Sequence, residues 1–149
     1  MEFEKIKSEI LELAKEFNAC REEYKKAYKS ENIDELLSVV KENLSWCVNN
    51  KMLDANKLVE LFTEEKLNSI NIFTTGEHNL TVKEGLENIY TLGSSSANVE
   101  TWGSSSANVK TLGSSSANES VLSDNSYIRN HNKKTIYIKK DSFNIEYLD

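Results

Sequence analysis

The side chains of this chain that could do chemistry are few. The sequence holds two histidines, His78 and His131, and two cysteines, Cys20 and Cys47. Neither histidine has a cysteine or carboxylate pair at metal-ligand spacing beside it. A cysteine with a histidine could form a nucleophile and base, but both cysteines fall on apolar stripes of predicted helices, where they are expected to be reduced core thiols. We therefore predict no catalytic residue, metal site or cofactor, and a chain that is not an enzyme.

Three serine-rich segments, which begin at Gly93, Gly103 and Gly113, offer backbone amides and hydroxyls that could hold a phosphate. Each lacks the lysine and the following helix of a phosphate-binding P-loop. Glycine allows positive φ and serine can bond to the nearby backbone, so these segments are expected to be turns. A small-ligand module that binds a nucleotide remains an alternative.

The turns belong to three consecutive decapeptides, 89–98, 99–108 and 109–118, each of which ends in Gly-Ser-Ser-Ser-Ala-Asn. A fixed period is typical of stacked architectures. Apolar and polar residues alternate within each repeat, which predicts a half-buried strand whose second repeat residue faces water. With two repeats per turn, Ile89 would stack near Val109. The residues expected to face inward are Ala97, Val99, Thr101, Ala107, Val109 and Thr111.

The first part of the chain has the pattern of helices instead. A heptad seam of apolar residues runs over residues 2–28 and predicts one helix, in an intramolecular hairpin or bundle or in a two-chain coiled coil that would form a homodimer. Two further apolar stripes predict helices up to about residue 68. The expected fold class is α+β: a helical region over 1–68, then a short β-solenoid (β-helix) with C-terminal cap strands over 69–149. A flexible serine-rich linker is the alternative for the repeats.

The segments Ser-Ala-Asn-Val-Glu and Ser-Ala-Asn-Val-Lys resemble the Ala-(Asn/Asp)-Leu core of pentapeptide-repeat proteins, which form right-handed β-helices. Only alternate pentads fit, because glycine stands where the family has a central Leu or Phe. The decapeptides also resemble short-period tandem-repeat β-solenoid proteins of bacteria, phages and mobile elements. Some pentapeptide-repeat proteins are DNA mimics that act on DNA-handling enzymes, so the resemblance implies an inhibitory role as one function.

Composition and charge narrow the partners. The 24 acidic and 18 basic side chains give a net charge of −6, which argues against a general nucleic-acid binder. No apolar run is long enough to span a membrane, so we expect a cytoplasmic protein without a membrane partner. The tail mixes basic and aromatic residues, a composition that can hold RNA. An edge hairpin kept from aggregating by its lysines is the alternative.

We therefore expect a non-catalytic binding protein whose partner is a host protein or ribonucleoprotein complex. The leading hypothesis is a phage- or mobile-element-type, anti-CRISPR-like inhibitor of an RNA-guided nuclease or another defence complex; the alternative is a structural scaffold or particle component. The candidate partner contacts are Trp102, Tyr90, Glu100, Lys110, Arg129, Lys133, Lys134, Tyr137, Lys139 and Lys140.

Overall fold

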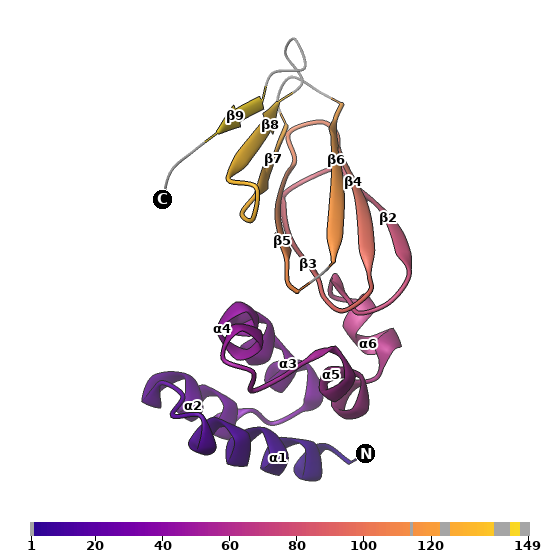
Figure 1. The fold of residues 1–149 in the computed structure, drawn as a ribbon. Helices are drawn as coiled ribbons and strands as arrows, with labels where there is room; N and C mark the ends of the chain where they lie inside the picture. Colours follow the sequence, from indigo (N-terminus) through magenta and orange to yellow (C-terminus); the bar gives the residue numbers. More distant parts are fainter. Residues whose placement is uncertain (1, 114, 123–125, 139–143, 147–149) are drawn as a thin grey trace. The chain divides into compact units, whose positions relative to one another are not determined.

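The protein, a computed structural model, consists of two compact units, Met1–Leu67 and Asn68–Asp149. The structure describes residues 2–113, 115–122, 126–138 and 144–146. The first unit is helical and the second is built mainly of strands (Figure 1).

Short amphipathic helices form the first unit, and their apolar sides supply its core. Side chains cap three of the helix starts: Asn32 accepts a hydrogen bond from the backbone of Glu35, Asp54 from that of Lys57, and Thr63 from that of Lys66. The largest fully buried side chains of this unit are Leu36, Leu37, Leu44, Leu53, Leu58 and Leu67. The helices are α1 (Phe3–Glu16), α2 (Arg21–Lys29), α3 (Ile33–Glu42), α4 (Leu44–Asn49), α5 (Ala55–Phe62) and α6 (Glu64–Asn68).

The single helix predicted over residues 2–28 is wrong. The helix α1 ends at Glu16 and α2 begins at Arg21. Between them Asn18 has a φ of 56°, in the left-handed region where an α-helix cannot continue. The heptad seam is therefore interrupted, and it does not form the continuous coiled coil on which the predicted homodimer depended.

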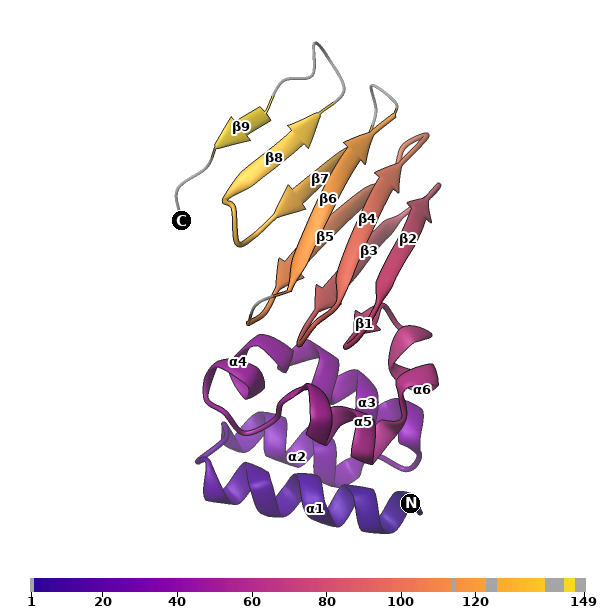
Figure 2. The same ribbon diagram turned by 45° about the vertical axis from the view of Figure 1, so that its right-hand side comes forward.

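The strands of the second unit form two sheets (Figure 2). One has six strands in the order β1-β3-β5-β7-β8-β9, and the other has three in the order β2-β4-β6. In the six-stranded sheet the strands β1, β3, β5 and β7 pair in parallel, and β8 and then β9 continue the sheet in antiparallel orientation. All pairs of the three-stranded sheet are parallel. The strands are β1 (Ile72–Phe73), β2 (Glu77–Val82), β3 (Leu86–Thr91), β4 (Ser96–Thr101), β5 (Ser106–Thr111), β6 (Ser116–Val121), β7 (Tyr127–Asn130), β8 (Thr135–Ile138) and β9 (Asn144–Glu146).

This arrangement corrects the predicted fold class. The Gly-Ser turns divide the strands between two separate open sheets, and among the described strands neither sheet closes on itself, so the β-solenoid prediction is wrong. The strands are mainly parallel, which is closer to α/β proteins than to the predicted α+β class, although the helices precede the sheets instead of alternating with strands.

Successive repeats lie in opposite sheets, so residues twenty positions apart pair side by side. Ile89 pairs with Val109, as predicted. The inward positions are also confirmed for Ala97, Val99, Ala107 and Val109, each at most 1% exposed. They form one core cluster together with Phe73, Val82, Ile89, Ala117 and Ile128.

The second residue of each repeat behaves less uniformly than predicted. Glu100 is exposed and Lys110 is half-buried. Tyr90 is only 8% exposed, so the expectation that it faces water is wrong. Its ring lies 5.8 Å from the Lys110 ammonium, which covers part of it.

The middle serine of each Gly-Ser-Ser-Ser turn joins neighbouring strands. Ser95 Oγ lies 2.8 Å from the carbonyl of Phe73 and 2.6 Å from that of Leu92. Ser105 Oγ makes the same contacts with Val82 and Trp102, at 2.8 and 2.6 Å. Because these hydroxyls satisfy buried backbone carbonyls, they serve the fold and are not available to a phosphate.

We predict that Val109→Asp unfolds the strand unit. Val109 is 0% exposed, and an unpaired carboxylate in its place would cost about 3 kcal/mol or more. Ser120→Asp is the matched control, because it adds the same charge at an exposed position of β6. Thermal unfolding followed by circular dichroism should show a large loss for the first variant and little change for the second. Equal losses would contradict the assigned faces.

The two cysteines should react differently, because only one of them is buried. Cys20 is exposed at the start of α2, contrary to its predicted place in the core, whereas Cys47 is buried. Burial raises the pKa of the Cys47 thiol to about 11, so it stays protonated at neutral pH. Iodoacetamide at pH ~7 should therefore modify Cys20 well before Cys47, as measured by peptide mass spectrometry. Modification of both at one rate would contradict the burial of Cys47.

Candidate functional site

Three neighbouring parallel strands, β3, β5 and β7, place polar and aromatic side chains on the outer side of the six-stranded sheet. The strand register aligns them in rows that cross the strands. His131 follows β7, and its backbone N–H donates to the Val109 carbonyl at 3.0 Å, which brings it level with Lys110. We call this surface the basic face; its members are Asn88, Tyr90, Asn108, Lys110, Tyr127, Arg129 and His131.

A hollow of about 160 Å³ lies on the basic face between Asn88, Tyr90, Asn108, Lys110 and His131. The amide of Asn108 donates to Asn88 Oδ1 at 3.0 Å, which holds the floor of the hollow in place. Burial raises the pKa of Tyr90, so its hydroxyl stays protonated at neutral pH. An ammonium group, a phenol and amides around one hollow are suited to hold an anionic group.

The outer side of the three-stranded sheet has the opposite character. An amide ladder crosses it: Asn98 donates to Asn79 at 2.9 Å, and Asn118 donates to Asn98 at 3.1 Å. Its charged outward residues are the carboxylates Glu77 and Glu100. The candidate contact Glu100 therefore lies on a different sheet from Tyr90 and Lys110, and the three do not form one surface.

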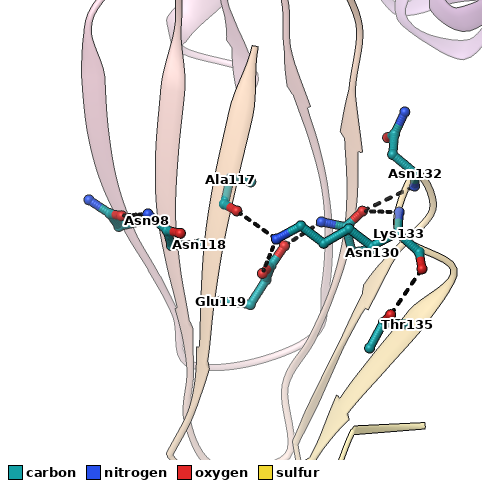
Figure 3. Close-up of polar contacts among 8 residues, drawn as sticks. All are labelled: Asn98, Ala117, Asn118, Glu119, Asn130, Asn132, Lys133 and Thr135. Atoms are coloured by element: carbon teal, nitrogen blue, oxygen red, sulfur yellow. Dashed lines mark hydrogen bonds and ion pairs between the residues drawn. The ribbon is translucent and has the colours of Figure 1, made fainter. Parts of the chain in front are cut away.

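The basic tail is not one surface either. Lys133 Nζ lies 3.6 Å from the carboxylate of Glu119, whose side chain is 2% exposed, and 3.2 Å from the Ala117 carbonyl (Figure 3). Asn130, which is 0% exposed, also donates to Glu119. This lysine neutralises a buried carboxylate at the end of the core. It is a structural residue in this arrangement.

The remaining candidates are dispersed. Arg129 is exposed on the basic face, and Lys134 is exposed in the turn between β7 and β8. Tyr137 is half-buried and packs against the core cluster, on the other side of the sheet from Arg129. Trp102 is 45% exposed in the turn after β4. Lys139 and Lys140 lie outside the described residues.

The reactive side chains named from the sequence are placed as follows. The His78 ring stacks on Phe73 with centroids 4.2 Å apart, and its Nε2 lies 2.8 Å from the Thr75 carbonyl. Within the described residues no group of three or more His, Cys, Asp or Glu side chains could hold a metal ion. No helix in that part of the chain is long and apolar enough to cross a membrane.

Sequence reasoning missed how Asn88, Asn108 and His131 gather around Tyr90 and Lys110. The signal that could have found them is the pairing distance of twenty residues, because it puts Asn88 beside Asn108 and Tyr90 beside Lys110. His131 falls outside this rule, since the last perfect repeat ends at Asn118.

Comparisons of the chain with protein-family models, with curated proteins and with solved structures find no match. They add nothing to the resemblance to pentapeptide-repeat proteins, which stays a prediction. The interpretation as an anti-CRISPR-like phage protein is corrected: it rested on a β-solenoid, the two open sheets replace that fold, and nothing found supports a phage origin.

We predict that Lys133→Met lowers the free energy of unfolding by about 1–3 kcal/mol, because it leaves the buried Glu119 carboxylate without its ammonium partner. Adding Glu119→Gln, which removes the buried charge but keeps an acceptor for the Asn130 amide, should recover most of the loss. Lys134→Met is the matched control and should have little effect. Chemical denaturation measures all three, and equal losses for Lys133→Met and Lys134→Met would contradict the role of the ion pair.

Proposed function

We propose that this chain is a non-catalytic, cytoplasmic binding protein that holds single-stranded nucleic acid, such as RNA, on the basic face. The observation that carries the proposal is the separation of charge between the two sheets. Lys110 and Arg129 share the outer side of the six-stranded sheet, whereas Glu77 and Glu100 lie on the outer side of the other.

This separation answers the objection raised by the net charge of −6. A polyanion responds to the local field of the surface it meets, and screening at physiological salt limits that field to about 8 Å. Binding is therefore expected to be local to the basic face and weakened by salt. The carboxylates on the outer side of the three-stranded sheet would repel nucleic acid from that sheet.

The side chains of the basic face suit single-stranded nucleic acid better than a duplex. Lys110 and Arg129 can pair with phosphates, and Tyr127 is 42% exposed on the same side, where a base could stack on its ring. Stacking on an aromatic ring contributes about 1–3 kcal/mol per base. The amide groups of Asn88 and Asn108 add hydrogen bonds between these points.

The test is binding of a fluorescent single-stranded oligouridine, followed by anisotropy at several salt concentrations. We expect Lys110→Gln with Arg129→Gln to weaken binding about tenfold or more at low salt, and less as salt rises. The negative slope of log K against log salt should become less steep by about 0.7 for each lost phosphate contact.

The matched control is Lys83→Gln with Lys134→Gln, which removes the same charge from exposed positions that are not members of the basic face. It should bind nearly as well as the parent. Trp102→Ala should also bind normally, because Trp102 lies in the turn between β4 and β5 and is not a member of the basic face. Absence of oligouridine binding, or equal losses in the two double variants, would overturn the proposal.

A further inference from the structure

The helical unit contains a cavity of about 400 Å³ that the proposed function does not use. Its walls come from α1, α2, α3 and α4 and from the segments that follow α1 and α4. The buried residues that line it are Ile10, Ala14, Ala27, Val40, Cys47 and Met52. Ligand pockets in proteins usually measure about 300–1,000 Å³ and are mostly apolar with a few polar groups. This cavity has that size and that lining.

Two aromatic side chains and one carboxylate complete the wall. Tyr24 is half-buried and Trp46 is 38% exposed, so both rings lie between the apolar interior and the solvent. Glu23 is the charged residue of the lining. Its carboxylate accepts hydrogen bonds from the Asn43 amide and the Lys26 ammonium, each at 2.9 Å.

The carboxylate of Glu23 is therefore fixed in place and charged. The hydrogen bond from Asn43, with that from Lys26, lowers the pKa of Glu23, so the group is ionised at neutral pH. A carboxylate has about four lone-pair sites, and these two bonds leave room for a further donor. The indole ring of Trp46 also attracts cations over its face, whereas the Tyr24 ring already has the Lys15 ammonium 5.8 Å from its centroid.

We propose that this cavity binds a small apolar molecule that carries one cationic group. The apolar part fills the space between α1, α2 and α3, and the cation lies against Glu23 beside Trp46. A neutral molecule of the same shape gains the apolar contacts but not the ion pair. An anion finds no cationic partner among the residues that line the cavity, because Lys26 is not among them and is paired with Glu23, so the charge of the ligand distinguishes this site from a general hydrophobic surface.

Three probes that share a naphthylmethyl group test the proposal on the full chain: naphthylmethylammonium, neutral naphthylmethanol and anionic naphthylacetate. Calorimetry gives their affinities, and amide chemical shifts locate them. We expect the cation to bind most tightly and the anion most weakly, with shifts at the residues that line the cavity. Glu23→Gln keeps an acceptor for Asn43 but removes the charge, so it should weaken the cation about tenfold and leave the neutral probe unchanged.

Glu22→Gln is the matched control, because Glu22 is exposed on the same helix and does not line the cavity. It should leave all three affinities unchanged. Ala19→Phe, at the wall of the cavity, should weaken all three probes by filling it. Shifts outside the cavity, equal affinities for cation and anion, or the same loss in Glu22→Gln and Glu23→Gln would overturn the proposal. The oligouridine test of the strand unit has a separate outcome, because it uses other residues.

Discussion

The strand unit depends on the narrow space between its two sheets. Ala97 and Ala107 are both fully buried there, with Val99 and Val109 beside them. Small side chains let two short strands from successive repeats lie in facing sheets, and the chain then returns to the first sheet after twenty residues. The features of the repeats follow from this return. It sets the register, aligns the asparagine ladders and gathers the outward side chains into rows.

Most positions of the repeat are explained by this packing. Gly93 and Gly103 have φ values of 54° and 56°, which non-glycine residues rarely adopt. Ser95 and Ser105 satisfy carbonyls of the neighbouring strand, and the asparagines hydrogen-bond along each sheet. The strands and their buried faces could therefore be predicted from the sequence, because each repeat residue has a local physical reason. The overall class could not, because alternation alone does not say how many sheets the strands form.

The sequence was least informative where a single local interaction overrides the pattern. The heptad spacing continues through Cys20, yet the left-handed backbone at Asn18 ends α1 and exposes that thiol. Tyr90 occupies a position that alternation assigns to solvent, but it is buried. The sequence does not reveal that Lys133 pairs with the buried carboxylate of Glu119. Periodicity averages over many residues, so it cannot reveal such individual contacts.

The candidate site includes side chains from a repeat position that has no role in the turns, the core cluster or the asparagine ladders. The glycine, the middle serine, the alanine and the asparagine of the repeat have structural roles, in turns, carbonyl contacts, core and ladder respectively. The second residue of each repeat has none of these roles. It is Tyr90 in the first repeat, Glu100 in the second and Lys110 in the third. Because successive repeats alternate between sheets, Tyr90 and Lys110 meet on one side while Glu100 lies on the other. A chain built this way can change the charge of one outer surface without altering its core.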